Sequence, residues 1–420
     1  MMEASRNGEW MLRDRWDPEC DADLADDGSG LPRALLYATS AALGGTGLDS
    51  TSLEGALAAA QGGFLKEALA FGGNAKGRLG GVAKSLNWHP VRLLSALESP
   101  LYYGAKKRYT ARHAAWRLRR GAFDFFHGWS GDAFAALVEA RRQGVPSVID
   151  IPTWHRNKGQ TKPAETRSER ERRLGPRLGW REQLPVTRLE MLAEYDLADG
   201  ILVPSACSAR TFLAAGIEPE RLHYVGRGVD VARYRPAEKV PERFRAIFVG
   251  ALIHRKGVHR LLEAWKKAGL KDAELLLIGQ VHEEVKPDLA RWADASVKVP
   301  GFSRRIQDDL RESSLFVFPS ECEGFAKSTL EAAACGLPIL GTRESGDAIV
   351  DGETGRVVAV DDVEALVAGL REAAENRDAW AAMGRAGRAR VERCLTWDHY
   401  RGRILRAYRE VNRQVGRGGE

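Results

Sequence analysis

The sequence has few cysteines and no long apolar run. Only five of its 420 residues are cysteine, and no two of them form a C-x-x-C pair. This odd number and spacing argue against a disulfide framework or a zinc site and favour a reducing, cytoplasmic location. No stretch reaches the roughly 18 apolar residues that a membrane-spanning helix needs. The first residues, MMEASRNGEW, lack the apolar core of a secretory signal, so secretion is not expected.

The charges are unevenly distributed along the chain. Hydrophobic residues make up 44% and charged residues 29%, a composition typical of globular proteins, and the length suggests two or three domains of roughly 150 residues each. The net charge is +6, yet residues 1–30 contain nine acids and three arginines, which predicts a loose acidic tail. Residues 105–120 contain seven bases and no acid, and residues 156–182 contain nine bases and four acids.

These two basic segments have alternative explanations. They could bind anions, membrane phosphates or nucleic acid, but a solvated face of an amphipathic helix explains 105–120 more simply. Nucleic acid is the least favoured partner, because the basic runs lack interleaved aromatic residues of the stacking kind. Residues 156–182 also contain glycine and proline and are predicted to form a mobile loop or insertion.

Short apolar runs alternate with helical patterns in two consecutive stretches of the chain. In the first stretch the strand-like runs are residues 31–42, 123–129, 145–152, 201–205 and 222–226. In the second they are residues 244–250, 273–279, 296–301, 315–320, 337–342 and 355–360. Residues 75–120 are predicted to be helical, as is the stretch that follows the last strand. Alternation of this kind predicts an α/β fold with parallel sheets.

A polar segment separates the two stretches. Residues 233–243 contain two prolines and several charges, as expected for a linker between domains. The predicted organisation is therefore a tail (1–30), an N-terminal domain (31–235), a C-terminal domain (236–395) and a final helical segment (396–420).

The most informative segment is PSECEGFAKSTLEAAACGLPIL, residues 319–340. A buried strand leads into a turn with Glu323 and Gly324, and a helix begins near Lys327. Amides at a helix start favour phosphate, and a glycine lets a ligand approach the chain closely. At about 1.5 Å per helical residue, Glu323 and Glu331 would be roughly 12 Å apart, beyond the about 5–9.5 Å of a hydrolytic carboxylate pair. Unless both are simply solvated, these acids suit opposite ends of one long ligand, such as a sugar linked through a diphosphate to a ribose.

This segment resembles the signature of the retaining GT-B glycosyltransferases of family 4. The resemblance rests on Glu323-Gly324-Phe325 and on the E-x7-E spacing to Glu331. It extends to the motifs FVGALIHRKG (248–257), VPSACSARTF (203–212), GVD (228–230) and GLPILGT (336–342). It covers residues 35–410 and is strongest over 190–360. The combined motifs are specific for the family but not for a substrate.

The resemblance implies the α/β fold called GT-B. In this fold two Rossmann-like domains with parallel sheets face a cleft, and a C-terminal helix crosses back to the first domain. TWDHYRGRILRAY, residues 396–408, is similar to that final helix. A nucleotide-sugar donor would bind mainly to the second domain, and the first domain would handle the acceptor.

The resemblance also implies roles for the residues of the signature. Glu331 would hold the ribose hydroxyls, and Glu323 would hydrogen-bond the donor sugar as a catalytic residue. The amides of Gly324, Phe325 and Ala326 would meet the phosphates or the sugar.

Two adjacent cations are further candidates for donor binding. Arg255 and Lys256 come just after the strand-like run 244–250, at the edge where open α/β sheets bind ligands. A guanidinium fork and an ammonium point charge suit a diphosphate and can stabilise a leaving group without metal. No DxD-type acid pair at a strand end has a clear metal role. Many relatives have an arginine directly after the glycine matched by Gly250; Ala251 stands there in this sequence, so Arg255 would supply that charge.

Three positions in the first domain complete the set of candidates. Gly45 belongs to a glycine turn after the first strand, which by the resemblance would close over the donor phosphates and the acceptor. His155 follows the strand-like run 145–152 and, by the resemblance, would act in catalysis facing the donor sugar, although a structural histidine is an equally open reading. His127 is a weaker candidate for the acceptor side.

The sequence departs from the family pattern in two places. Residues 345–352, SGDAIVDG, lack the glutamate of the usual glycine-glycine-x-x-Glu element, and Arg227 replaces the asparagine that often precedes the GVD motif.

These observations predict a metal-independent, retaining hexosyltransferase. It would move a hexose from a nucleotide diphosphate sugar to an acceptor hydroxyl, in polysaccharide or glycolipid biosynthesis, with no cofactor besides the donor. The acceptor would be a saccharide or a lipid-linked molecule, and the basic segments could give peripheral contact with the inner face of a membrane. The alternatives are a sugar phosphorylase or epimerase on the same scaffold, and a non-catalytic nucleotide-sugar binding partner.

Overall fold

The chain folds into two compact units. The computed structural model describes residues 30–73, 75–87, 90–96, 99–174, 179–238 and 241–417. The C-terminal unit comprises Ser205–Cys207 and Gly226–His399, and the N-terminal unit comprises the other described residues. The boundary at Gly226 precedes the expected one after residue 235. The expected acidic tail lies outside the described residues except for Gly30.

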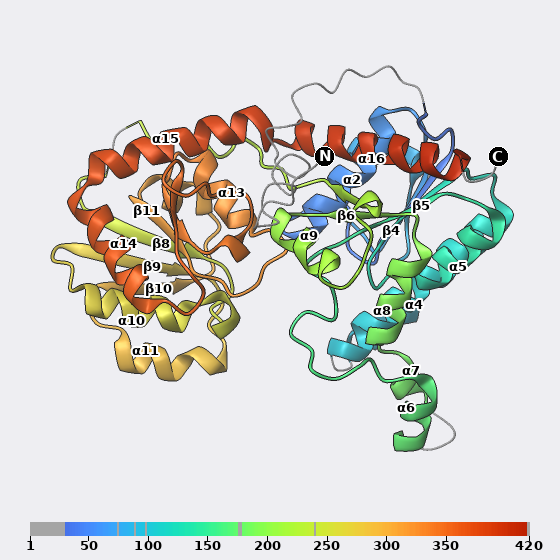
Figure 1. Ribbon diagram of the computed structural model, residues 1–420, viewed down its shortest axis with the longest axis horizontal. Coiled ribbons are helices and arrows are strands. Elements are labelled where there is room, and N and C mark those ends of the chain that lie inside the picture. Colours follow the sequence, from blue (N-terminus) through green and yellow to red (C-terminus); the bar gives the residue numbers. More distant parts are fainter. Residues whose placement is uncertain are drawn as a thin grey trace, which may run out of the picture. The chain divides into compact units, whose positions relative to one another are not determined.

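Seven parallel strands form the sheet of the N-terminal unit, in the order β3-β2-β1-β4-β5-β6-β7. They are β1 (Leu35–Ala38), β2 (Leu65–Ala70), β3 (Ala83–Ser85), β4 (Phe125–Trp129), β5 (Ser147–Asp150), β6 (Gly200–Val203) and β7 (Leu222–Tyr224). The central strands are buried at every residue, because helices cover both faces of the sheet (Figure 1). Strands in that position read as continuous apolar runs, which is why the sequence indicated them.

Apart from the last helix of the chain, six longer helices among the described residues belong to this unit or lead into it. They are α2 (Leu48–Gln61), α4 (Ser99–Arg120), α5 (Phe134–Gln143), α6 (Arg167–Leu174), α8 (Arg188–Leu197) and α9 (Ala206–Leu213). A short helix, α3 (Ala75–Arg78), and two 3-10 turns lie between β2 and α4. As expected, α5 ends at Gly144, whose left-handed φ of 67° a side chain would strain.

Two strands at one edge of this sheet were not predicted. Strand β2 reads LKEALA, whose residue types favour a helix, so only its tertiary position makes it a strand. Residues 75–120 were expected to be helical throughout, which is wrong for β3, a three-residue edge strand with two exposed residues. Edge strands this short carry too little apolar pattern to be recognised.

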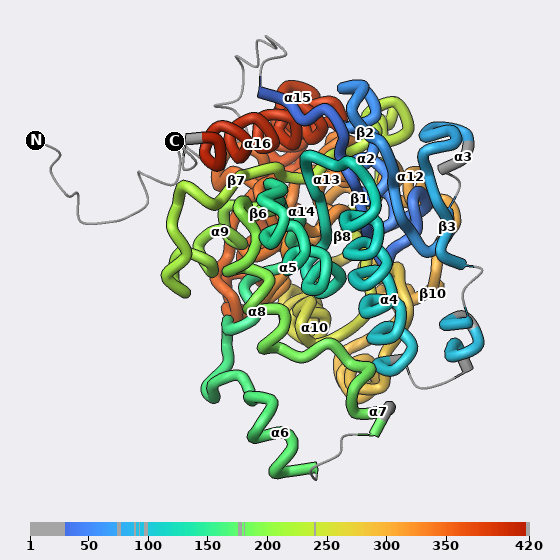
Figure 2. The backbone as a smooth tube through the Cα atoms, turned by 90° about the vertical axis from the view of Figure 1, so that its right-hand side faces the viewer, coloured from blue at the N-terminus to red at the C-terminus, as the bar shows by residue number. Residues whose placement is uncertain are grey.

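The segment 156–182 is not merely a loop. It contains α6 and the short helix α7 (Trp180–Gln183), and both lie beyond α8, away from the sheet of their own unit (Figures 1 and 2). The sequence RSERERRL of α6 has no buried residue and therefore no apolar stripe to reveal a helix. Arginine and glutamate are good helix formers, and Arg167 pairs with Glu171 one turn later at 2.8 Å.

Six parallel strands form the sheet of the C-terminal unit, in the order β10-β9-β8-β11-β12-β13. They are β8 (Phe244–Val249), β9 (Ala273–Ile278), β10 (Val297–Gly301), β11 (Leu315–Phe318), β12 (Ile339–Gly341) and β13 (Gly355–Val357). The helices of this unit are α10 (Val258–Ala268), α11 (Lys286–Trp292), α12 (Ile306–Arg311), α13 (Lys327–Ala334), α14 (Val363–Glu375) and α15 (Arg377–Cys394). Every strand was predicted, whereas α11 was not.

The last helix, α16 (Trp397–Arg417), belongs to the N-terminal unit from Tyr400 onward. The Tyr408 hydroxyl lies 2.6 Å from His127 Nδ1, and Glu410 lies 2.8 Å from His223 Nδ1. The end of the chain thus packs on β4 and β7. None of the helices in the described part of the chain combines the length and apolar character needed to cross a bilayer.

Candidate active site

In the C-terminal unit, one carboxylate contacts both of the adjacent cations. Glu323 follows β11, and Arg255 and Lys256 lie in the 3-10 turn His254–Lys256 that follows β8, the neighbouring strand. Arg255 Nη1 and Lys256 Nζ each lie 3.1 Å from Glu323 Oε1. Arg255 also donates to the carbonyl oxygen of Cys322. The side chains of Glu323 and Lys256 are only 13% and 16% exposed, so their charges interact with less screening than at an open surface.

Backbone contacts bring the two strand ends together. Gly257, which ends the turn, has φ of 72°, and a Cβ added there would lie 2.0 Å from the carbonyl oxygen of Pro319. Any side chain at Gly257 would therefore push the two loops apart. The carbonyl oxygen of Arg255 accepts from the Glu321 amide at 2.9 Å and from the Ser320 hydroxyl at 3.2 Å. Lys256 Nζ lies 4.9 Å from the centre of the Phe318 ring, which further restricts its position.

The loop after β12 holds the other side of the Glu323 turn. The Glu323 amide donates to Glu344 O at 3.1 Å, and the Ala326 amide donates to Ser345 O at 3.0 Å. Ser345 Oγ in turn donates to Phe318 O at 2.8 Å. The Ala326 amide therefore already has an acceptor, which counts against its predicted contact with a ligand, and that contact stays untested. The proposed roles of the Gly324 and Phe325 amides stay predictions.

Ser345 is a supporting residue that the sequence did not reveal. The segment 345–352 was noticed only for the glutamate that it lacks. Its first residue instead fixes the turn that carries Glu323, through contacts that depend on the parallel packing of β11 and β12. Its place in the short loop that follows an apolar strand was the available signal.

Glu331 lies on α13, one turn after Lys327. Burial raises the pKa of the Glu331 carboxyl, while Lys327, the Tyr234 hydroxyl and Arg233 oppose that rise. A carboxylate in such surroundings keeps its charge only through these partners. The C-terminal unit thus brings together Arg255, Lys256 and Glu323, with Glu331 on the helix that follows.

In the N-terminal unit, Gly45 lies in an exposed turn after β1. Its φ is 133°, a value that favours glycine. Asp49, in the first turn of α2, closes this turn: its Oδ1 accepts from the Ala42 amide at 3.1 Å and its carbonyl oxygen from the Gly44 amide at 2.9 Å. The geometry is compatible with the predicted phosphate-facing turn, and the role itself stays a prediction.

His155 is buried inside the N-terminal unit, with 4% of its surface exposed. Its ring centre lies 5.0 Å from those of Tyr195 and Phe212, and its Nδ1 accepts from the Asn157 amide at 3.2 Å. Burial lowers the pKa of this histidine, with Asp196 opposing. Packing accounts for the residue in this unit, so its burial counts against the predicted catalytic role, which stays untested.

His127 is a core residue rather than an acceptor-side residue. It is fully buried on β4, where Tyr37 and Tyr408 pack against its ring, and burial lowers its pKa to about 3. The loop after β4 instead contains Asp132, whose Oδ2 accepts from the Ser40 amide at 2.6 Å, and it is contacted by the fully buried Glu194 of α8. Glu194 accepts from the Gly131 amide at 2.5 Å and the Ala133 amide at 3.0 Å.

Most cations of the first basic segment have partners within their own unit. Lys107 lies 3.5 Å from Asp132, Arg108 lies 2.7 Å from Glu190, Arg117 pairs with Glu67, and Arg119 lies 3.8 Å from Glu139. The absence of acids within 105–120 was misleading, because the acids come from other elements of the fold. In contrast, the charged side chains of α6 contact residues nearby in the sequence, as Arg167 does with Glu171 and Arg170 with the carbonyl oxygen of Glu182, and none of them is buried.

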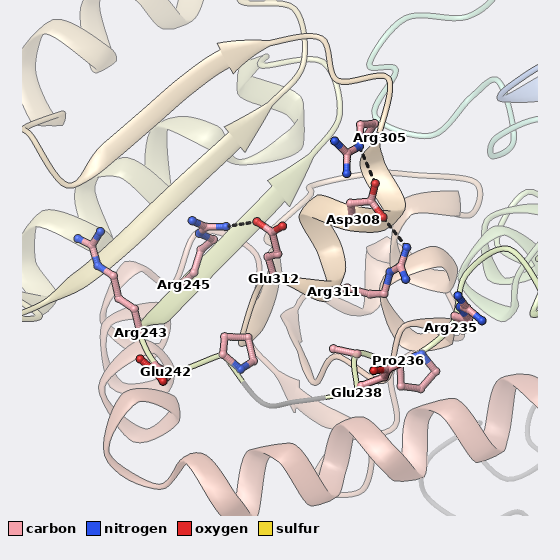
Figure 3. A pocket seen from close by; sticks show the side chains of 12 residues that line it. Arg235, Pro236, Glu238, Glu242, Arg243, Arg245, Arg305, Asp308, Arg311 and Glu312 are labelled. Carbon is pink, nitrogen blue, oxygen red and sulfur yellow. Dashed lines mark hydrogen bonds and ion pairs between the residues drawn. The ribbon is translucent and has the colours of Figure 1, made fainter.

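A large hollow in the C-terminal unit contains none of the predicted donor residues. It has a volume of about 720 Å³ and is lined partly by Arg243 and Arg245, at the start of β8 (Figure 3). Arg245 pairs with Glu312 at 3.2 Å, and Asp308 pairs with both Arg305 and Arg311. Ligands of open α/β sheets bind at the opposite, carboxyl ends of the strands, so this hollow is not the candidate active site. No cluster of three or more His, Cys, Asp or Glu side chains suited to a metal ion occurs among the described residues.

Comparison with known proteins identifies the family. Residues 77–233 match the family model described as Glycosyltransferase Family 4, and residues 243–376 match the one described as Glycosyl transferases group 1. The chain is 30% identical to the alpha-maltose-1-phosphate synthase of Mycolicibacterium smegmatis, over 48% of this chain and 60% of that protein. It is 31% identical to the GDP-mannose-dependent monoacylated alpha-(1-6)-phosphatidylinositol monomannoside mannosyltransferase of Corynebacterium glutamicum, over 53% of this chain and 65% of that protein. The matched regions thus span less than two thirds of these relatives.

The fold has solved counterparts. The crystal structure of Anabaena HepE in complex with UDP and glucose matches with a TM-score of 0.60 and 16% identity, over 92% of this chain and 98% of HepE. At that identity the likeness shows the fold alone, two Rossmann-like parallel-sheet domains of the GT-B class. One family model matches most of the N-terminal unit and the other matches most of the C-terminal unit. The chain therefore belongs to the family 4 glycosyltransferases, also called group 1.

Proposed function

We propose that this protein is a retaining glycosyltransferase that moves a hexose from a nucleotide diphosphate sugar to an acceptor hydroxyl, in polysaccharide or glycolipid biosynthesis. Family membership supports the reaction class, and the names of the two relatives, a maltose-1-phosphate synthase and a mannosyltransferase, support a hexose. The observation that carries the proposal is the contact of Glu323 with both Arg255 and Lys256 at the carboxyl ends of two neighbouring strands.

Arg255 and Lys256 bind the diphosphate of the donor in this proposal. Glu323 holds both cations at one place, and phosphate oxygens would compete with its carboxylate for them. When the sugar leaves, negative charge grows on the diphosphate, and two fixed cations stabilise that charge more strongly than they stabilise the intact donor. The proposed reaction therefore uses no metal and no cofactor besides the donor.

The two glutamates bind the groups on either side of the diphosphate. Glu331 accepts hydrogen bonds from the ribose hydroxyls. Glu323 accepts from a hydroxyl of the sugar once the phosphates engage its cations. The Gly324 and Phe325 amides, in the turn that precedes α13, are the donors for the remaining oxygens.

In this proposal retention arises in a single step, in which the acceptor attacks from the face that the leaving group occupies. The bond between the anomeric carbon and the phosphate oxygen breaks, the bond to the acceptor oxygen forms, and a departing phosphate oxygen takes the acceptor proton. The protein contributes positioning and charge stabilisation to this step.

The acceptor side of the proposal belongs to the N-terminal unit. Gly45 lies in the turn that would approach the donor phosphates and the acceptor, and His155 is the candidate for contact with the sugar. A saccharide or lipid-linked acceptor fits the names of the relatives, and the exposed cations of α6 would give contact with an anionic membrane surface. Co-sedimentation with phosphatidylserine vesicles at low salt tests that contact, and it fails if no protein sediments with them.

The reaction is tested with UDP-glucose and GDP-mannose as donors. A bound donor should raise the melting temperature, because it binds only the folded state, and slow hydrolysis should release the nucleoside diphosphate without any acceptor. Glu323→Ala should lower turnover by about 100-fold or more, the usual cost of removing one group that stabilises transition-state charge. Its matched control is Glu321→Ala, which removes a carboxylate from the same loop. The Glu321 carboxylate pairs with Arg260 at 2.7 Å. Equal turnover of the two variants would exclude the role of Glu323, and release of no nucleotide from either donor by the unmodified protein would contradict the proposed reaction.

A further inference from the structure

Lys106 of α4 lies at the carboxyl edge of the sheet in the N-terminal unit. Phe71 directly follows β2, and Lys106 Nζ lies 5.1 Å from the centre of its ring. The rings of Tyr102 and Tyr103, one helical turn earlier on α4, have their centres 5.6 and 5.8 Å from the same nitrogen. Three aromatic rings therefore lie around this ammonium group and restrict its position.

The loops after β1, β2 and β4 are joined to one another at this edge. The Leu43 amide donates to the Gly72 carbonyl oxygen at 2.9 Å, which joins the loop after β1 to the loop after β2. The Ser40 amide donates to Asp132 Oδ2 at 2.6 Å, which joins the loop after β1 to the loop after β4. Lys106 thus lies beside the ends of three neighbouring strands, where open α/β sheets bind ligands.

The two acids that act electrostatically on Lys106 already have other partners. These acids are Asp132 and Asp49. Asp132 Oδ1 lies 3.5 Å from Lys107 Nζ, and Asp49 Oδ1 accepts from the Ala42 amide at 3.1 Å. Among the described residues, no carboxylate lies within ion-pair distance of the Lys106 ammonium, and no acceptor lies within its hydrogen-bonding distance. Its three N–H donors are therefore available to a ligand.

The surroundings of Lys106 favour a negatively charged ligand over a neutral one. Burial lowers the pKa of Lys106, with Asp132 and Asp49 opposing from a distance. The rings attract the cation but do not offset its charge. An anionic group against the ammonium would offset the cost of burial, because a hydrogen bond between charged groups is about twice as strong as a neutral one. A hydroxyl would accept a hydrogen bond without balancing the charge.

We propose that Lys106 binds an anionic group, a phosphate or a carboxylate, of the acceptor. This inference rests on the function proposed above, in which the N-terminal unit handles the acceptor, and it adds that the acceptor is negatively charged. The donor diphosphate is assigned to Arg255 and Lys256 of the C-terminal unit, so the anion at Lys106 is a second one. Each unit then has its own cations for its own substrate.

The test measures the binding of glucose 6-phosphate, glucuronic acid and the neutral methyl glucoside by isothermal titration calorimetry. The protein is first saturated with UDP or GDP, so that the sugars do not bind at the diphosphate site. At least one charged sugar should bind about tenfold or more tightly than methyl glucoside, because only a charged group balances the ammonium. Tighter binding of glucose 6-phosphate assigns a phosphate, and tighter binding of glucuronic acid assigns a carboxylate.

Lys106→Gln removes the charge and keeps a polar side chain. Affinity for the charged sugar should fall by about tenfold or more, the value of a hydrogen bond between charged groups, while nucleotide affinity stays unchanged. Lys66→Gln is the matched control. The Lys66 ammonium also lies near an aromatic ring, 5.2 Å from the centre of Phe123, but it is exposed and donates to the Ala122 carbonyl oxygen at 2.8 Å. This control should leave both affinities unchanged.

Amine labelling of the unmodified protein tests the same contact without a substitution. The charged sugar should slow acetylation of Lys106 by N-hydroxysuccinimide acetate and leave Lys66 unaffected, as measured by peptide mass spectrometry. This measurement decides the question if Lys106→Gln does not fold.

Three results would each overturn the role of Lys106 while the proposed function stands. They are nucleotide binding without binding of either charged sugar, equal sugar affinity in Lys106→Gln and the unmodified protein, and unslowed acetylation of Lys106. If the unmodified protein binds neither UDP nor GDP, the proposed function fails, and the acceptor role of Lys106 fails with it.

Discussion

The two units contain the same kind of sheet but use its carboxyl edge differently. In the C-terminal unit, the loops after β8 and β11 bring Arg255 and Lys256 each to 3.1 Å from the Glu323 carboxylate. In the N-terminal unit, the buried Glu194 of α8 instead binds the backbone of the loop after β4, through the amides of Gly131 and Ala133. The comparison teaches that two kinds of contact differ: charged side chains from two strand-end loops that meet one another form a candidate ligand site, whereas a carboxylate that accepts from backbone amides fixes a loop.

Lys256→Ala should have the largest effect of the predicted substitutions, because it removes a cation from the turn after β8 that is proposed to bind the donor. Affinity for UDP or GDP should fall by about 100- to 1000-fold, since a poorly screened contact between an ammonium and a phosphate is lost. Isothermal titration calorimetry measures the change. Lys267→Ala is the control, because that lysine is exposed and pairs with Glu263 and Glu364 on the surface of the same unit.

An unchanged nucleotide affinity in Lys256→Ala would mean that this lysine does not bind the ligand. The two sheets would then not differ in how the charged residues after their strands are used. The lysine would then serve only to hold Glu323 in place, as Glu194 holds the loop after β4 in the N-terminal unit.

The second prediction concerns Glu194, the buried carboxyl group that binds the loop after β4 in the N-terminal unit. Burial raises the pKa of Glu194 from 4.5 to about 7, although the Gly131 and Ala133 amides oppose the rise. A carboxyl group whose pKa is higher in the folded state binds protons more tightly there, so the contribution of Glu194 to folding stability is greatest below about pH 4.5. It falls as the pH rises and levels off above about pH 7, with a total change of roughly 3 kcal/mol.

Melting temperatures at pH 5 and pH 8 measure this dependence. Glu194→Gln cannot ionise, so the difference between the two pH values should be smaller in the variant than in the unmodified protein. The variant should also be less stable at pH 5, because its amide nitrogen cannot accept from one of the two backbone amides. The same pH dependence in both proteins would contradict the assignment of the buried proton to Glu194.

The sequence predicted most strands because both sheets are buried on both faces. Continuous apolar runs such as LFVF in β11 can hardly be anything else between two turns. The sequence failed for β2 and β3, at the edge, and for α6, which is helical without an apolar face. In these elements neighbouring parts of the chain or local charge pairs, rather than the hydrophobic pattern, select the structure.

The candidate site was predictable where residues adjacent in sequence act together. Arg255 and Lys256 follow one strand, and Glu323 and Glu331 share one segment. Contacts between distant segments were not predictable: the Ser345 hydroxyl donates to the Phe318 carbonyl oxygen only because the fold brings together the loops after the neighbouring strands β11 and β12. The same limit applied to His127, since nothing in FFHGW shows that α16 covers it.

The smallest effect is expected for His155→Phe, which asks whether the N-terminal edge contributes chemistry at all. Phenylalanine keeps the ring that packs between Tyr195 and Phe212 and loses only the acceptor for the Asn157 amide. If the histidine serves packing, turnover should stay within about threefold, and the melting temperature should fall by a few degrees for one lost hydrogen bond. A catalytic acid–base group would instead cost about 100-fold or more in turnover. A loss of that size with an unchanged melting temperature would mean that the ring leaves its aromatic neighbours during the reaction, and the N-terminal edge would then be a working part of the active site.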